Sequence, residues 1–155
     1  MRSKRVKKRP IIPDPVYKSK VVTRMVNIVL QDGKKATAES IVYGALEKLN
    51  EDKKEAVKMF EEAVKNVMPQ QEVRSRRVGG ATYQVPYPLK HDRAEALAVR
   101  WLVEAARRKQ GNEMVERLYK ELQDAYEGVG DAIRKRDETH KAAESNRAFA
   151  HFARF

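Results

Sequence analysis

The chain of 155 residues contains no cysteine. This absence excludes disulfide bonds, thiolate metal sites and cysteine nucleophiles, and it agrees with a reducing cytosol. No apolar run approaches the roughly 18 residues that a membrane-spanning helix needs. The basic start of the chain also lacks the apolar stretch of a secretory signal, because prolines and an aspartate follow it directly. We therefore expect an intracellular, soluble protein.

Negative charge is in short supply, since 22 Asp and Glu face 33 Lys and Arg, for a formal net charge of +11. A surplus of this size is typical of proteins that bind polyanions. The charge is also unevenly spread. The charged residues of 1–20 are all basic except Asp14, whereas those of 110–132 are six acidic and two basic. One face is thus expected to meet an anion and another is not. A soluble basic protein without a dedicated partner is the alternative.

The length and the 41% of apolar residues suit a single domain with its own core. Residues 1–18 are basic and broken by prolines, so we expect a disordered arm. Residues 19–155 are expected to form one mainly α domain, a bundle of about six helices. The apolar periodicity indicates helices from Ser19 toward Gly33, over 38–49, over 57–67 before Pro69, from Asp92, over 115–126 and from Asp131.

Two of these helices have distinctive patterns. The fourth carries apolar residues on more than one stripe, which indicates a central helix buried on several sides. Its start resembles a capping box, with Asp92 followed three positions later by Glu95. The sixth has a thin apolar face and many charges, so we expect it to lie across the surface.

The segment 72–88, EVRSRRVGGATYQVPYP, interrupts the helical pattern between the third and fourth helices. The pair Gly79-Gly80 suits a tight two-residue turn, which would place Arg76 opposite Tyr83 and Arg77 opposite Thr82. Both faces of such a β-hairpin would be polar, and a lone polar hairpin is marginal in water. The bundle must therefore hold its base and another contact its tip. A solvated surface loop is the alternative.

The chemistry of this hairpin favours RNA. Guanidinium groups grip phosphates, and an aromatic ring such as that of Tyr83 can stack on an unpaired base. Pro86 and Pro88 would remove amide donors from the returning strand and so limit edge-to-edge aggregation. We interpret the hairpin as a protruding, RNA-touching arm.

No motif of a catalytic or cofactor site is complete. The sequence around Lys34 and Lys35 fails as a nucleotide-binding phosphate loop, because Ile28 stands where that motif needs glycine. The two lysines still lie at an expected helix start, where a phosphate of an RNA backbone is attracted. The three histidines are scattered without metal-ligand spacing. We expect no enzyme, no cofactor and no metal.

The C-terminus is rich in aromatic residues, since three of the four phenylalanines fall in the last seven positions, interleaved with basic residues. Two interpretations are open. A terminal helix docks on the protein's own core, or the rings stack on RNA or on a neighbouring protein.

Several motifs resemble one family. Residues 19–45, the segment EVRSRRVGGATYQVP, and the later ALAVRWLVEAARRK and NRAFAHF are similar to bacterial small-subunit ribosomal protein seven, over nearly the whole chain. The ending AHFARF differs from the family's shorter close. The resemblance implies a non-enzymatic, cytoplasmic constituent of the small ribosomal subunit. It also implies binding to the 3′ major domain of small-subunit rRNA, where the protein would nucleate assembly of the head.

The resemblance further implies that the hairpin lies near the exit-site tRNA and the mRNA path, with ribosomal small-subunit proteins nine and eleven as neighbours and without a homo-oligomer or membrane contact. Charge and resemblance together indicate as rRNA contacts Arg2, Lys4, Arg5, Lys7, Lys8, Arg9, Lys34, Lys35, Arg74, Arg76, Arg77, Arg93, Arg100, Arg108, Lys135 and Arg136. The positions expected near tRNA and mRNA are Gly79, Gly80, Ala81, Thr82, Tyr83 and Arg147.

The main rival is a helical DNA-architectural protein, because a basic bundle with a β-arm could wrap duplex DNA through the minor groove. An enzyme is the weakest alternative.

Overall fold

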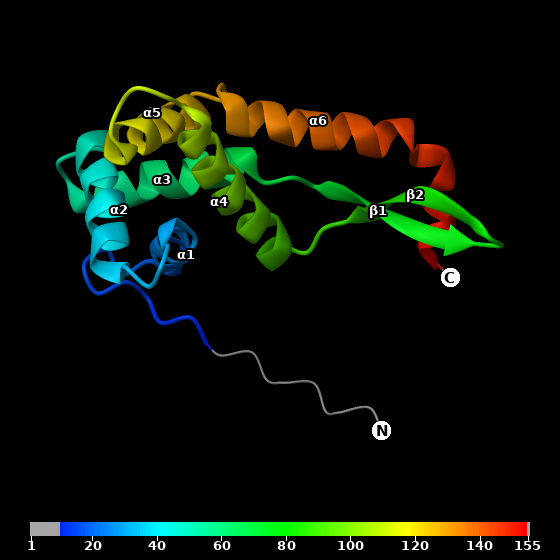
Figure 1. Ribbon diagram of the computed structural model, residues 1–155, viewed down its shortest axis with the longest axis horizontal. Helices are drawn as coiled ribbons and strands as arrows, with labels where there is room; N and C mark the ends of the chain where they lie inside the picture. Colours follow the sequence, from blue (N-terminus) through cyan, green and yellow to red (C-terminus); the bar gives the residue numbers. More distant parts are fainter. Residues whose placement is uncertain (1–9, 155) are drawn as a thin grey trace.

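The computed structural model describes residues 10–154 (Figure 1), and within them it is mainly helical. The elements are α1 (Lys20–Val29), α2 (Lys35–Leu49), α3 (Lys53–Val67), β1 (Gln71–Val78), β2 (Ala81–Pro88), α4 (His91–Arg108), α5 (Met114–Tyr126), α6 (Asp131–Ser145) and the 3₁₀ helix η1 (Arg147–Arg154). The predicted bundle with a hairpin arm between the third and fourth helices is confirmed. The separate 3₁₀ helix at the C-terminus was not predicted.

Local sequence explains several helix ends. Ser19 caps α1 by accepting a hydrogen bond from the amide of Val21, and Asp52 caps α3 by accepting one from the amide of Lys54. Helix α3 ends just before Pro69, with Met68 in an extended conformation, because the proline ring disfavours helical geometry at the preceding residue. The predicted end of the third helix is therefore confirmed.

The predicted capping box at the start of α4 is wrong. The helix begins at His91 after Lys90, which makes no side-chain capping bond. Glu95 makes no hydrogen bond to the backbone at the start of its helix; its carboxylate forms an ion pair with Arg24 of α1, at 2.5 Å, and lies 3.8 Å from the His91 ring. An ion pair between half-buried side chains outweighs the modest gain of a cap in solvent.

Helix α4 is the centre of the bundle, as its broad apolar pattern predicted. It packs against α1, α3, α5 and α6. The residues that it buries are Ala94, Leu97, Ala98, Val99, Leu102, Val103, Ala105 and Ala106. Helix α6, by contrast, buries only Ala132, Ile133 and Ala143 and runs along the outside of the molecule (Figure 1), which confirms the prediction of a surface helix.

The part of the arm from Asp14 onward is docked on the bundle, although residues 1–18 were expected to be disordered. The carboxylate of Asp14 accepts hydrogen bonds from the amides of Val16 and Tyr17 and from the hydroxyl of Tyr43, the last at 2.7 Å. Tyr17 is buried and its ring packs against that of Tyr43. Burial, followed by the hydrogen bond to Asp14, raises the pKa of Tyr43. Residues 1–9 lie outside the described residues.

The corner between α5 and α6 is built on a buried carboxylate. Glu121 is fully buried, accepts a hydrogen bond from the amide of Ala132 and pairs with Lys109 at 2.8 Å. Burial lowers the pKa of Lys109, but hydrogen bonds to Glu121 and Asp124 outweigh it and raise the pKa overall, so the ammonium stays charged at neutral pH. Gly130 has a φ of 99°, and a Cβ there would approach the Cβ of Asp124 to 2.9 Å.

Replacing Glu121 with Ala should lower the free energy of unfolding by about 2 kcal/mol, because the change leaves the buried amide of Ala132 without its acceptor and removes one of the two carboxylates that pair with Lys109. Chemical denaturation followed by circular dichroism measures this. Glu127→Ala, directly after the same helix, is the matched control, since its side chain is exposed, and it should change stability by less than about 0.5 kcal/mol. Equal losses in both variants would contradict a structural role for the buried pair.

Candidate nucleic-acid interface

The hairpin has the register that the sequence predicted. Arg76 lies opposite Tyr83, Arg77 opposite Thr82, and the turn is Gly79-Gly80. Both glycines have positive φ, of 57° and 91°, which side chains with a Cβ rarely adopt. The hairpin therefore extends from the bundle as a continuous two-stranded arm (Figure 1).

The base of the hairpin is held by the bundle, as expected, but it is not polar on both faces. Val85 is fully buried, which corrects the prediction of two polar faces. The amide of Leu89 donates to the carbonyl of Gln70 and closes the base. The amide of Gln70 donates to Nε2 of His140 on α6, at 3.0 Å. These contacts fix the angle at which the arm leaves the domain.

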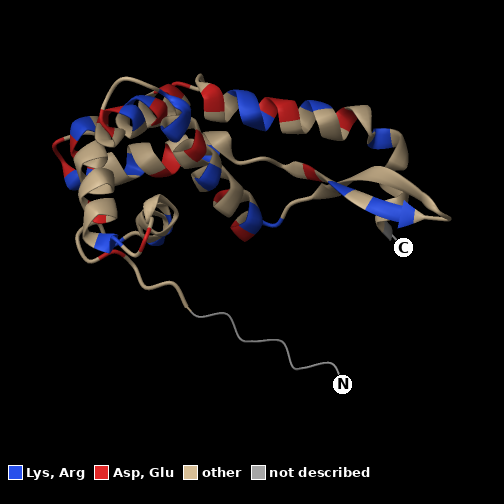
Figure 2. Cartoon of the chain, in the orientation of Figure 1, with Lys and Arg blue, Asp and Glu red and all other residues tan. Residues whose placement is uncertain are grey.

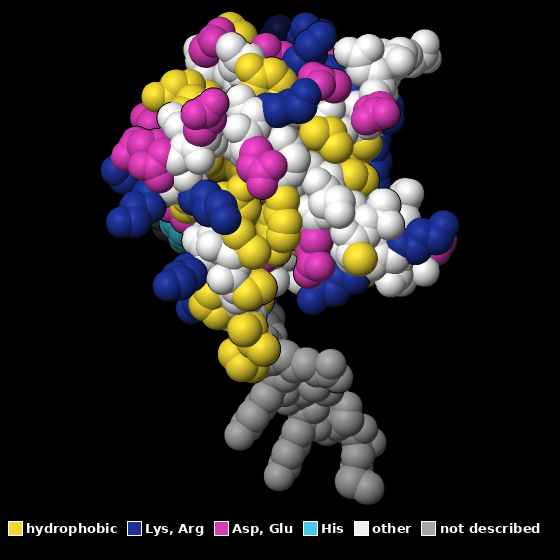
Figure 3. Space-filling view, turned by 90° about the vertical axis from the view of Figure 1, so that its left-hand side faces the viewer, with side chains coloured by type: hydrophobic (Ala, Val, Ile, Leu, Met, Phe, Trp, Pro, Cys, Tyr) yellow, Lys and Arg dark blue, Asp and Glu magenta, His cyan; other side chains and the backbone are white. Residues whose placement is uncertain are grey.

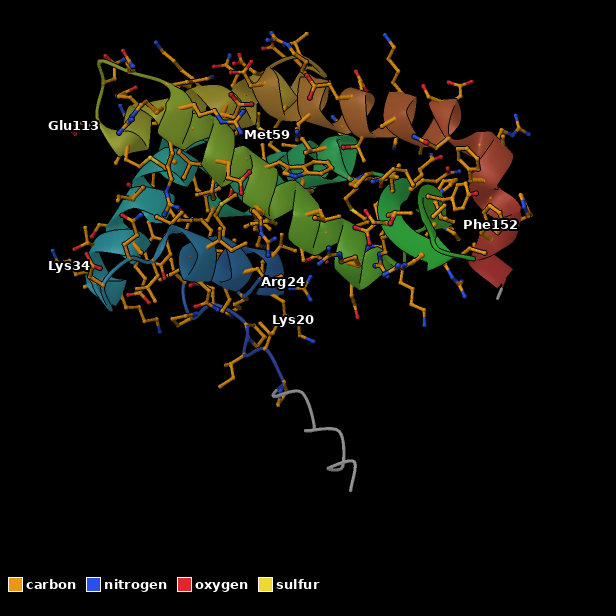
Figure 4. The ribbon with its side chains drawn as sticks, turned by 45° about the vertical axis from the view of Figure 1, so that its right-hand side comes forward. Lys20, Arg24, Lys34, Met59, Glu113 and Phe152 are labelled. Atoms are coloured by element: carbon orange, nitrogen blue, oxygen red, sulfur yellow. The ribbon has the colours of Figure 1, made fainter. Side chains whose placement is uncertain are left out.

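The outer half of the hairpin is covered by the protein's own C-terminus. The Tyr83 ring lies 5.3 Å from that of Phe149 and 5.0 Å from that of Phe152, between ring centroids. Arg76 donates from Nη1 to the carbonyl of Phe152, at 2.7 Å. Figure 4 shows Phe152 on η1 beside the hairpin. The aromatic tail thus docks within its own chain, on the hairpin and not on the helical core.

The three predicted arginines of the first strand have different surroundings. Arg74 pairs with Glu72 and lies over the ring of Tyr87, with Cζ 5.7 Å from the ring centroid. Arg93 at the start of α4 also pairs with Glu72, at 3.3 Å. Arg77 is exposed and, among the described residues, makes no ion pair. Arg76 also makes no ion pair within residues 10–154, but it is half-buried and donates to the Phe152 carbonyl, so Arg77 is the strand arginine best placed to meet an external anion.

The other predicted cations of the bundle face solvent. Lys34 is the residue before α2 and Lys35 its first residue, and both are exposed, with Lys35 3.4 Å from Glu39. Figure 4 shows Lys34 at the end of the molecule away from η1. Arg100 and Arg108 are exposed on α4. The positive end of the α2 dipole adds to the two lysines and favours a phosphate there.

The predicted RNA-contact residues on α6 and η1 differ in their exposure. Lys135 is exposed on α6, and Arg147 is exposed at the start of η1. Arg136 is half-buried and donates to the carbonyl of Asn66 at 2.6 Å, so it holds α6 to α3 and is not turned outward. The sequence carried a signal for this, because Arg136 follows the buried Ala132 by four positions on one helix face. The six predicted arm residues, Arg2, Lys4, Arg5, Lys7, Lys8 and Arg9, lie outside the described part.

Sequence reasoning missed the roles of several other cations. Arg107 donates to the carbonyls of Ile28 and Val29 and so caps α1. Arg117 donates to the carbonyl of Lys109 at 2.7 Å, beyond the end of α4. No local signal marks these two, because the carbonyls they reach belong to other segments of the chain.

One outward-facing cation was also missed. Arg134 is exposed beside the predicted Arg108 and Lys135, and these three side chains line a small polar hollow of about 240 Å³. Its place on the solvent face of a thinly apolar helix was a usable signal. The carboxylates of Asp131 and Glu138 lie in the same hollow and offset part of its positive charge.

The surface charge differs along the molecule. In Figure 2, blue segments lie on strand β1 of the hairpin and strand β2 is tan, while α6 alternates between blue and red. Figure 3 shows the end opposite the hairpin, where basic and acidic side chains surround an apolar strip.

Over residues 10–154, no helix has the length and apolar character to cross a bilayer, and no cluster of histidine and carboxylate side chains is suited to a metal.

Comparison with known proteins agrees with this geometry. The sequence model of the family described as Ribosomal protein S7p/S5e matches residues 1–147. The chain belongs to this family. Among similar S7p/S5e members is the small ribosomal subunit protein uS7 of Nautilia profundicola, 54% identical over 98% of this chain and 99% of the relative. The uS7 proteins of Kocuria rhizophila and Pelagibacter ubique are 56% and 50% identical, over 94% and 97% of both chains.

Replacing Arg74, Arg76 and Arg77 together with Ala should leave the helical bundle folded, because their side chains lie outside its core. The midpoint of thermal unfolding, followed by the helical signal, should move by only a few degrees. Loss of cooperative unfolding would show that the arm is an integral part of the core.

Proposed function

We propose that this S7p/S5e family member is a structural, non-catalytic constituent of the small ribosomal subunit in the cytoplasm, and that it binds the 3′ major domain of small-subunit rRNA. The family match along almost the whole chain carries the proposal, and the relatives are named as proteins of that subunit. The net charge of +11 and the exposed cations of the hairpin, α2 and α4 support RNA as the ligand.

We assign the phosphate contacts to cations whose side chains are exposed. Lys34 and Lys35 combine two ammonium groups with a helix N-terminus, which suits a phosphate of the RNA backbone. Arg100 and Arg108 offer planar guanidinium forks from the rigid central helix. Each phosphate that these groups neutralise releases counterions, so binding weakens as salt is added.

The hairpin gives the protein reach beyond the bundle. Its tip, Gly79 to Thr82, has small exposed residues, and we assign it to the vicinity of the exit-site tRNA and the mRNA. We expect ribosomal small-subunit proteins nine and eleven to be the protein neighbours of this chain. Since RNA junctions are recognised by shape and by backbone contacts, arginines on a rigid helix and on an arm can read a folded junction. Such binding would nucleate assembly of the head.

The test is a filter-binding titration of the full chain against a transcript of the 3′ major domain at fixed, near-physiological salt. Unrelated RNA and duplex DNA of equal length serve as competitors. Binding that survives both competitors supports the proposal. Equal loss to all competitors would mean that net charge alone drives binding, and bending of the duplex DNA would favour the DNA-architectural function instead.

Deleting residues 1–9 should flatten the dependence of log Kobs on log salt by about 0.7 to 0.9 for each phosphate contact removed. The segment carries six basic side chains, whereas residues 10–18 contain the buried Asp14 and Tyr17 and must be kept. The measurement is the RNA titration repeated at several salt concentrations. An unchanged slope would mean that these basic residues do not touch RNA.

A further inference from the structure

The C-terminal helix η1 is longer than a 3₁₀ helix usually is. It spans 8 residues, whereas 3₁₀ runs beyond three or four residues are uncommon because their hydrogen-bond geometry is poor. With three residues per turn, Phe149 and Phe152 lie on the same side of η1. Both rings meet Tyr83 of the hairpin. The contact with Tyr83 therefore stabilises this helix in addition to its own backbone hydrogen bonds.

The contact between η1 and the hairpin is both apolar and polar. The ring centroids of Tyr83 and its two phenylalanine neighbours are 5.0 and 5.3 Å apart, within the favourable range for aromatic pairs. Arg76, the cross-strand partner of Tyr83, donates to the carbonyl of Phe152 at 2.7 Å. A charge-assisted hydrogen bond thus reinforces the aromatic cluster.

This contact is not an extension of the helical core. A hollow of about 740 Å³ separates the inner part of the hairpin, at Pro86 and Pro88, from α6 and the start of η1, at Ala143 and Arg147. The hairpin is thus held at its base by the bundle and α6, and farther out by the Tyr83 cluster.

The two faces of the hairpin are consequently different. Side chains alternate along a strand, so Arg76 and Tyr83 share the face covered by η1, and Arg77 and Thr82 share the other. The uncovered face also carries Ser75 and Gln84, joined by a hydrogen bond of 2.9 Å from Nε2 of the amide to the hydroxyl. These four residues, in the outer part of this face, are exposed, whereas Pro86 on the same face is buried nearer the base.

We propose that Tyr83 and Arg76 are positioning residues that anchor η1, and that this anchor holds the hairpin extended so that its uncovered face, with Arg77, meets RNA. The inference rests on the proposed function. It reassigns Tyr83 from base stacking and Arg76 from phosphate contact to an internal role, because both are already engaged by the tail. The RNA contact of the arm then belongs to Arg77 and its neighbours.

The physical reason for such an anchor is the instability of a lone two-stranded hairpin in water. Apparent affinity falls in proportion to the population of the binding-competent conformation. Packing of η1 against one face of the hairpin raises the population of the extended conformation before RNA binds. Less conformational entropy is then lost on binding.

The test compares three variants of the full chain: Tyr83→Ala, the double variant Phe149→Ala/Phe152→Ala, and their combination. Two quantities are measured, the affinity for the 3′ major domain transcript and the rate of amide hydrogen exchange over residues 71–88 in the free protein. The double variant keeps Arg147, so it removes the rings without removing that charge.

An anchor predicts that Tyr83→Ala and the double variant each weaken RNA binding by about three- to tenfold and speed exchange in the hairpin. It also predicts that the combined variant is no worse than either, since both remove one contact. Tyr126→Ala, which removes an exposed ring of α5, is the matched control and should not change hairpin exchange. Arg77→Ala should weaken binding without speeding exchange.

Base stacking by Tyr83 predicts the opposite pattern. Removing the two phenylalanines would then uncover the ring and leave affinity unchanged or raised, while Tyr83→Ala would lower it, and this result would overturn the proposal. Unchanged exchange over residues 71–88 in the double variant would overturn it as well. Failure of the proposed function looks different, because the wild-type chain would then fail to distinguish the transcript from the competitors, while exchange would still report on the anchor.

Discussion

The packing of α4 against four other helices is the constraint on which the rest of the structure depends. Its N-terminal end follows the base of the hairpin by a short connection, and its C-terminal end leads into Lys109, which pairs with the buried Glu121 of α5. Glu121 in turn holds the amide of Ala132 and so the start of α6. Helix α6 then leads to η1 at the outer part of the hairpin. One buried helix thereby sets both places at which the arm is held.

The positive charge of the protein is divided between cations that make internal contacts and cations that are exposed. Arg107 and Arg117 satisfy carbonyl groups at helix ends, where unpaired acceptors would cost free energy. Arg136 ties α6 to the carbonyl of Asn66. Such cations count toward the net charge but are not available to a ligand. We therefore propose that the RNA contacts fall to a subset of the basic residues, among them Arg77, which is exposed on the arm and makes no ion pair among the described residues.

The sequence predicted those features that local physics determines. Turn chemistry gave the register of the hairpin from Gly79 and Gly80, and proline geometry gave the end of α3. The sequence could not predict features that depend on partners far away in the chain. Asp14 is ordered by a hydroxyl 29 positions away, and Arg76 by a carbonyl 76 positions away. Within the predicted site, Arg77 is exposed whereas Arg76 is half-buried. This difference arises from the packing of η1 on the hairpin.

Lysine-reactive footprinting of the full chain, free and bound to the 3′ major domain transcript, tests most directly where RNA binds. We propose that RNA meets the basic faces at the hairpin, α2 and α4, and not the acidic segment around α5. Lys34 and Lys35 should lose reactivity on binding, while Lys120 on α5 should keep it. Protection of Lys120 equal to that of Lys34 would contradict the claim and indicate non-specific coating by charge.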